Sequence, residues 1–260
     1  MLRATAFPDI IGAAVAFLFI RAVMTADRKD MSYLIAFFGN SGAAAAVGSA
    51  FDCIAAGLIR LLFPAALLII LKRWKNVPVF PAFISFGVCY PVFILAGIIR
   101  SGFDTSDPAL FYIKQGVLYG IFEEGIKLAV IFYLSEHYDR KGFSVSCGIG
   151  HCAFEDVGAG FSCFALVGSD SIHPLIFWFN LWAAVEGVSF CTALSVLLYC
   201  GIRTGRIWRM LAAAVVLHAL SNAVGGIFGF SDTIVIVLRT VITAAVCYAA
   251  YLCGRDEQVL

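Results

Sequence analysis

The amino-acid sequence predicts an all-α, polytopic membrane protein: a transmembrane helical bundle of eight or nine helices around an intramembrane polar cavity. Three observations predict this fold. Hydrophobic residues make up 62% of the 260 residues, and charged residues only 13%. The apolar residues form continuous blocks of about 20 or more, long enough to cross about 30 Å of hydrocarbon. Glutamate and histidine nevertheless occur inside several of these blocks, where an unpaired charge is costly and a buried polar chamber is expected.

The apolar blocks predict the helices in order. Residues 1–47 form a hydrophobic extension with one retained segment near its start, followed by either a further span or an interfacial helix. Residues 48–254 form the main bundle, and 255–260 form a short tail. Within the bundle we expect spans at roughly 48–71, 79–99, 109–135, 143–168, 174–200, 207–228 and 232–253.

Charged loop residues predict the orientation. Basic side chains fall on one side of the predicted spans: Lys72, Arg73, Lys75, Arg140, Lys141, Arg203, Arg206, Arg209 and Arg255. The opposite loops carry Asp104, Asp107, Asp170 and Asp232, with Arg100 as the main basic exception. Because basic loops stay in the cytoplasm, we expect a cytoplasmic C-terminus.

The net charge and the cysteine pattern argue against nucleic-acid binding and against a framework of disulfides or cysteine-bound metal. A formal net charge of +1 gives no electrostatic support for nucleic-acid binding. The nine cysteines contain no CxxC pair and fall mostly in apolar segments, so we expect free buried thiols rather than disulfides or metal ligands.

The segment FEEGIK places three charged residues inside a span. Lys127 follows Glu124 by three residues and Glu123 by four, so either carboxylate can reach its ammonium group on a helix. A buried ion pair that orients helices is one interpretation. However, one lysine cannot neutralise two carboxylates that point about 100° apart. The remaining glutamate is a candidate for proton transfer.

Two further spans carry polar pairs at i, i+4 spacing. His151 precedes Glu155, and His218 precedes Asn222. A single histidine in an apolar helix is usually a core residue, but two such pairs at similar depth favour a shared site. Glu186 lies inside another span; a buried partner for a lysine or arginine and a functional role are equally open for it.

These residue types suit hydrolysis of an amide by an activated water. A carboxylate with an imidazole can deprotonate water, and an imidazole N–H with an amide NH₂ can donate to an oxyanion. The sequence has neither the GxSxG motif of serine hydrolases nor the HExxH zinc motif. We expect no cofactor. A composite zinc site from His151, Glu155 and His218 is the alternative.

The succession of FEEGIK, GIGHCAFE, a glutamate ahead of ALSVLL, and HALSN resembles the YhfC-type intramembrane proteases. These are similar to a wider group that contains PrsW and the type II CAAX prenyl endopeptidases. The similarity extends from about residue 57 to residue 226 and includes PAALLIILKRWK.

The resemblance implies a role for each matching position. Glu123 corresponds to the glutamate that activates water, and Glu124 to its partner tied to Lys127. His151 helps to hold the water, and His218 with Asn222 forms the oxyanion site. Supporting positions without an assigned role are Glu155 and Glu186.

We therefore expect a glutamic-type endopeptidase that acts on a membrane protein or a lipidated peptide within the lipid bilayer. The resemblance implies a bacterial cytoplasmic membrane. A proton-coupled transporter is an alternative, because midplane glutamate and histidine also relay protons. A scaffold without catalysis is another, because the superfamily includes scaffolds and fold does not fix function.

Overall fold

The computed structural model describes residues 49–256, apart from 139–141, 170–171, 174 and 229–232. Every regular element in this part of the chain is an α-helix, which confirms the all-α fold. The segments predicted within residues 1–47 lie outside the described residues, as does most of the predicted tail. The helices are α3 (Ala50–Lys75), α4 (Phe80–Arg100), α5 (Pro108–Ser135), α6 (Phe143–Ala165), α7 (Ile176–Arg203), α8 (Ile207–Phe228) and α9 (Thr233–Asp256).

The helices begin and end within about one turn of the predicted boundaries, and the differences have local causes. α3 runs to Lys75 rather than 71 because three basic residues in its last turn suit the negative end of a helix dipole. Asn76 then ends it in a left-handed conformation, at φ 54°. α9 extends to Asp256, so Arg255 belongs to the last turn of the helix and not to a tail.

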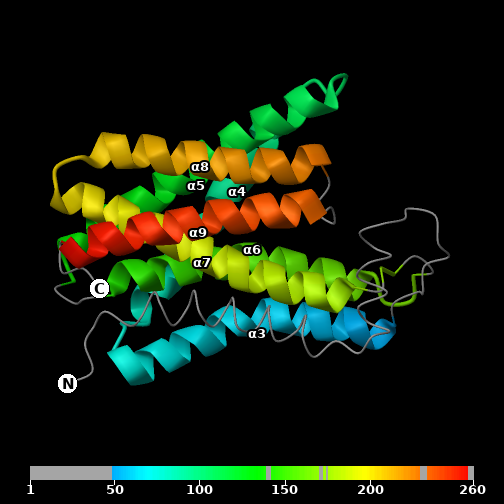
Figure 1. Ribbon diagram of the computed structural model, residues 1–260, viewed down its shortest axis with the longest axis horizontal. Helices are drawn as coiled ribbons and strands as arrows, with labels where there is room; N and C mark the ends of the chain where they lie inside the picture. The colour runs from blue at the N-terminus through cyan, green and yellow to red at the C-terminus, as the bar shows by residue number, and fades with distance from the viewer. Residues whose placement is uncertain (1–48, 139–141, 170–171, 174, 229–232, 257–260) are drawn as a thin grey trace.

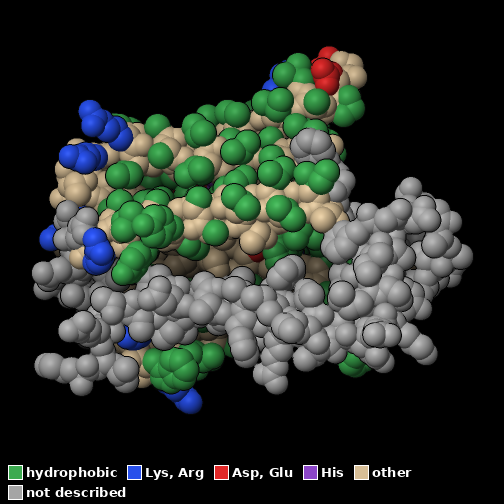
Figure 2. All heavy atoms as spheres, in the orientation of Figure 1, with side chains coloured by type: hydrophobic (Ala, Val, Ile, Leu, Met, Phe, Trp, Pro, Cys, Tyr) green, Lys and Arg blue, Asp and Glu red, His purple; other side chains and the backbone are tan. Residues whose placement is uncertain are grey.

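Five of the seven described helices are long and apolar enough to cross a membrane: α3, α4, α7, α8 and α9. The protein is therefore an integral membrane protein. Large hydrophobic side chains cover much of the described outer surface, as Figure 2 shows. In a bilayer such a surface contacts lipid rather than water. α5 and α6 are not among the five, because α5 carries several charges and α6 is rich in small and polar residues.

The helices lie side by side along one axis (Figure 1). α6 packs against α3, α4, α5 and α7, which places it at the centre of the bundle. α8 packs chiefly on α5, and α9 chiefly on α7. α6 and α7 supply most of the buried residues of the main core, including Ile149, Leu194 and Leu198. This packing brings together in space side chains of α4, α5, α6 and α8 that are far apart in the sequence.

Charge separates along the bundle axis. Figure 2 shows Lys and Arg side chains at the end where α3, α7 and α9 finish, and acidic side chains at the tip between α4 and α5. We call these the basic end and the acidic end. Asp104 and Asp107 lie at the acidic end, and the backbone and side-chain hydrogen bonds from Ser106 lower the pKa of Asp104. Arg100 at the end of α4 is an exception to the separation.

Candidate functional site

A close approach of α5 and α8 begins the site. A Cβ atom at Gly116 would lie 2.6 Å from the carbonyl oxygen of Ala219, and one at Gly120 would lie 2.8 Å from that of Val215. Both distances are shorter than van der Waals contact, so only glycine fits at this helix spacing. Since Gly120 precedes Glu123 by one turn, the approach brings Glu123 and Glu124 beside His218 of α8.

The GIGH segment positions α6 by the same principle. A Cβ at Gly148 would lie 2.8 Å from the carbonyl oxygen of Cys191 on α7, and one at Gly150 would overlap the backbone of Ala82 on α4. α6 is therefore wedged between two neighbouring backbones. His151, the next residue, is fully buried and faces α5.

Glu124 is held by two donors. Its Oε1 lies 2.5 Å from the Nζ of Lys127 and 2.5 Å from the Nδ1 of His218. All three side chains are buried. Glu124 and Lys127 therefore form the predicted i, i+3 pair. The pair fixes one ring nitrogen of His218 and so sets the direction of the other.

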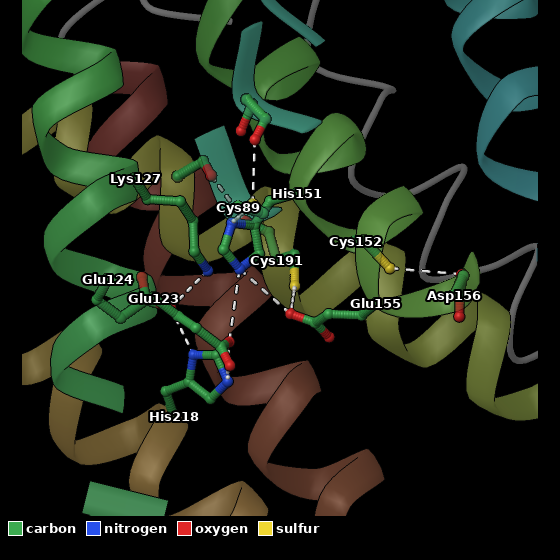
Figure 3. A network of polar contacts seen from close by, with 12 residues as sticks. Cys89, Glu123, Glu124, Lys127, His151, Cys152, Glu155, Asp156, Cys191 and His218 are labelled. Atoms are coloured by element: carbon green, nitrogen blue, oxygen red, sulfur yellow. Dashed lines mark hydrogen bonds and ion pairs between the residues drawn. The ribbon is translucent and has the colours of Figure 1, made fainter. Parts of the chain in front are cut away.

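Glu123 lies between the two imidazoles (Figure 3). Its Oε2 is 3.0 Å from the Nε2 of His218 and 3.5 Å from the Nε2 of His151. No lysine or arginine ion pair of Glu123 is found among the described residues. The two adjacent glutamates thus have different surroundings: Glu124 is neutralised by a fixed ammonium group, and Glu123 depends on histidines.

His151 has a partner at each ring nitrogen. Nε2 lies 3.2 Å from Oε1 of Glu155, one turn further along α6. Nδ1 lies 3.1 Å from the Sγ of Cys89 on α4, whose thiol also reaches the carbonyl oxygen of Ser85 at 3.0 Å. Glu155 is the most accessible acid of the cluster, with 34% of its side chain exposed.

A pocket of about 190 Å³ borders this cluster. Glu123, Glu155, His218 and Asn222 lie at one part of it. The rest of its lining is uncharged: Phe93, Tyr112, Gln115, Tyr119 and Gly226. The structure thus brings together at one pocket, from α5, α6 and α8, most of the residues that the sequence singled out. Asn222 contributes an amide one turn from His218.

Glu186 lies apart from this pocket. Its Oε2 accepts a hydrogen bond from Nη2 of Arg239 at 2.8 Å, and its Oε1 accepts one from Oγ1 of Thr243 at 2.7 Å. Both partners belong to α9, so the contact joins α7 to α9. Of the two interpretations of Glu186, the geometry favours the buried partner of an arginine.

Another ion pair outside the pocket joins α3 to α6. Nη1 of Arg60 lies 2.5 Å from Oδ1 of Asp156, and Nε of Arg60 donates to the side chain of Asn180 on α7 at 3.0 Å. Asp156 follows Glu155 directly but faces a different helix. This contact locks α3, α6 and α7 together and leaves Glu155 as the acid that faces the pocket.

Several residues at or near the site were missed by sequence reasoning. Tyr112, Gln115 and Tyr119 precede Glu123 by 11, 8 and 4 residues, a helical spacing that places all of them on one face. That spacing could have found them. Arg239 is an arginine inside an apolar span, which predicts that a buried acidic side chain pairs with it. Nothing in the sequence distinguished Cys89 from the other thiols.

The same cluster offers ligands for a metal ion. Ligand atoms of Glu123, His151 and Glu155 lie within 4.8 Å of one another. One imidazole and two carboxylates are donors that zinc accepts. This set contains two of the three residues of the predicted alternative; the third, His218, reaches it through the 3.0 Å contact with Glu123.

Comparisons of the chain with protein families, with curated proteins and with solved structures gave no match.

Proposed function

We propose that this protein is an intramembrane endopeptidase of the glutamic type, in which Glu123 activates a water molecule that attacks a peptide bond. The observation that carries the proposal is the position of Glu123. Its carboxylate lies between the imidazoles of His151 and His218 at 3.5 and 3.0 Å, and it borders a pocket of about 190 Å³. A base in such a setting can exchange a proton with a bound water and an adjacent imidazole.

The charge of the cluster supports a reactive site rather than a structural ion pair. Glu123, Glu124 and Glu155 supply three carboxylates, and Lys127 supplies one ammonium group, which leaves two negative charges if both histidines are neutral. Buried charge of this size is costly unless it is compensated. Two imidazolium ions or one divalent cation would balance it. The cluster is therefore built to hold protons or a cation.

The proposed reaction assigns a step to each group. Glu123 removes a proton from water, and the hydroxide attacks the carbonyl carbon of the substrate. The charge then moves to the carbonyl oxygen, where the amide of Asn222 and the Nε2–H of His218 stabilise it. Once Glu123 is protonated, its hydrogen bond to this N–H becomes weaker. The N–H can then donate to the oxyanion. Glu123 finally gives its proton to the leaving amine, and the peptide bond breaks.

The topology, the location and the substrate class also belong to the proposal. We infer that the complete bundle has eight or nine helices, with the basic end and the C-terminus in the cytoplasm of a bacterial cell. The substrate is a membrane protein or a lipidated peptide. The resemblance to YhfC-type proteases supports this assignment through Glu123, Glu124, His151, His218 and Asn222.

A cleavage assay tests the proposal. Purified protein in proteoliposomes is incubated with a library of internally quenched fluorescent peptides. We expect wild-type protein to cleave members of the library and Glu123→Gln to lose activity by a factor of about 10²–10⁴, since general-base catalysis contributes that much. Glu186→Gln is the matched control, a buried glutamate outside the pocket, and should retain cleavage. Wild-type turnover by Glu123→Gln would show that the mechanism is wrong.

A zinc peptidase is the second candidate, favoured by the cluster of Glu123, His151 and Glu155 within 4.8 Å. In that case these residues would hold the ion, and a bound zinc would supply a Lewis acid and lower the pKa of its water. Metal analysis of protein purified without a metal-affinity tag separates the two candidates. About one zinc per chain, lost together with activity on chelation, would favour the zinc peptidase.

A further inference from the structure

The pocket extends well beyond the carboxylates and imidazoles. On α5 its lining residues are Tyr112, Gln115, Tyr119 and Glu123, which follow one face of the helix. With a rise of 1.5 Å per residue, Tyr112 lies about 16 Å from Glu123 along the helix. The pocket is therefore a cleft that leads from the site toward the first turn of α5.

α8 forms another wall of the cleft in the same direction. Asn222 and Gly226 follow His218 by four and eight residues and line the cleft with it. A Cβ atom at Gly226 would overlap the ring of Tyr112, so this tyrosine lies directly against the α8 backbone. The wall ends within about one turn of the end of α8 at 228.

This direction leads to the acidic end of the bundle. Tyr112 is four residues from Pro108, where α5 begins, capped by Asp107. Figure 1 shows the α4–α5 connection projecting beyond α8 and α9 at that end. The basic residues that finish α3, α7 and α9 lie at the opposite end.

One lining residue has an unmet hydrogen-bond acceptor. Gln115 lines the cleft, but its Oε1 atom is closed to solvent and no described residue donates to it, so a rotation of the side-chain amide is needed to present this oxygen to an occupant. A buried carbonyl oxygen normally has a donor, and the N–H of an extended peptide backbone is suited to the role. Gln115 precedes Glu123 by eight residues, about 12 Å along α5. An extended peptide spans this distance with three or four residues.

The remaining lining indicates what the cleft accepts. Phe93, Tyr112 and Tyr119 supply aromatic surface, and no charged side chain of the described part of the chain lines the cleft between Gln115 and its outer end at Tyr112. A charged side chain would find no partner there. The chemistry fits an uncharged peptide segment with apolar side chains.

We propose that this cleft is the substrate entrance, through which an uncharged, extended peptide segment reaches the site from the acidic end of the bundle. Gln115 accepts a hydrogen bond from its backbone three or four residues from the bond that is cut. This inference rests on the proposed peptidase function for the identity of the occupant. The direction of access does not depend on cleavage and can be measured separately.

Side-specific thiol labelling tests the direction. Single substitutions Gln115→Cys and Tyr112→Cys are made in the full chain, which is placed in sealed vesicles and treated with a membrane-impermeant maleimide from one side at a time. Thr105→Cys and Arg206→Cys report which side each end faces, because both positions are exposed outside the helices. Val117→Cys, exposed on another face of α5, is the lipid-facing control, and wild-type protein gives the background from its native thiols.

We expect Gln115→Cys to react from the same side as Thr105→Cys, at least tenfold faster than Val117→Cys. Reaction from the side of Arg206→Cys, or a rate no higher than that of Val117→Cys for both cleft positions, would overturn the entrance. A wild-type protein that cleaves no library peptide would instead contradict the peptidase function and leave the labelling result valid.

Kinetics test the backbone contact. Gln115→Leu keeps the size of the side chain and removes the acceptor, so we expect a KM about tenfold higher with kcat within a factor of two. Gln115→Asn keeps an uncharged amide acceptor and should restore part of the affinity for library peptides. Unchanged KM in Gln115→Leu would remove the hydrogen bond from the proposal even if the labelling agrees with the entrance.

Discussion

Among the described residues, two buried clusters contain glutamate, and they differ in how the charge is compensated. At the α7–α9 contact, each oxygen of Glu186 has its own donor, one from Arg239 and one from Thr243. At the pocket, three carboxylates share one lysine and two histidines. Both oxygens of Glu186 are therefore satisfied without a ligand. The second cluster has more carboxylates than lysines, so protons or a cation must balance its charge, and it borders a pocket. Uncompensated titratable groups at a pocket are typical of functional sites.

Replacement of the pocket histidines should have the largest effect. We expect His218→Ala and His151→Ala each to lower the cleavage rate by a factor of about 10²–10⁴, because Glu123 loses a proton-exchange partner and the oxyanion loses a donor. The measurement is turnover of the quenched peptide library, with thermal unfolding as the check on folding. His137→Ala, at the exposed end of α5, is the control and should be silent.

Arg239→Met should act on stability and spare the chemistry. It leaves Glu186 as a buried charge without its arginine, which costs about 3–5 kcal/mol of unfolding free energy. The double variant Glu186→Leu, Arg239→Met should recover most of this loss, since an apolar pair needs no compensation. Unfolding in detergent and turnover per folded molecule are measured together. A loss of turnover without a loss of stability would place this cluster in the mechanism.

Gly120→Ala should disturb the close packing of α5 against α8 that builds the pocket. The added Cβ would meet the carbonyl oxygen of Val215, so α5 and α8 must separate, at a cost of about 1–3 kcal/mol. Turnover should fall as Glu123 and His218 move apart. Gly125→Ala is the matched control: no atom of the described residues lies within 4 Å of a Cβ built there, and alanine favours the helix. Equal effects from both substitutions would argue against the packing explanation.

Cys89 should have the smallest effect. Its thiol orients His151 without lining the pocket, so we expect Cys89→Ala to lower turnover several-fold. Cys89→Ser, which can still bond Nδ1 of His151, should stay close to wild type. Cys53→Ala removes another fully buried thiol, which belongs to a separate apolar cluster with Ala56 and Cys163, and provides the baseline. If serine were no better than alanine at position 89, the hydrogen bond to His151 would have no part in the rate.

Much of the fold could be predicted because the signal is local. Continuous apolar runs fix the existence of membrane helices, and the described helices begin and end near the predicted boundaries. Which helices touch depends on shape and could not be predicted in the same way. Gly116 and Gly120 bring α5 to α8, but a sequence contains many glycines that have no such role, Gly125 among them.

The candidate site was predictable in its charged members and not in its surroundings. Glu123, His151 and His218 are conspicuous because ionisable residues are costly in apolar helices. The same reasoning could have paired Arg239 with Glu186, although it does not reveal which acid an arginine meets. Neutral residues such as Gln115 and Cys89 carry no comparable signal, and their roles appear only when the helices are packed.

The proposed chemistry requires Glu123 and His218 to work as one unit. A double-mutant cycle in cleavage rate tests it, with Glu123→Gln, His218→Ala and the pair, beside a second cycle of Glu186→Gln with His218→Ala. When two residues act as one unit, replacing the second adds little to the loss of rate caused by replacing the first. We predict that His218→Ala causes no further loss in the Glu123→Gln background and its full loss in the Glu186→Gln background. Multiplying losses in the first cycle would contradict a shared site.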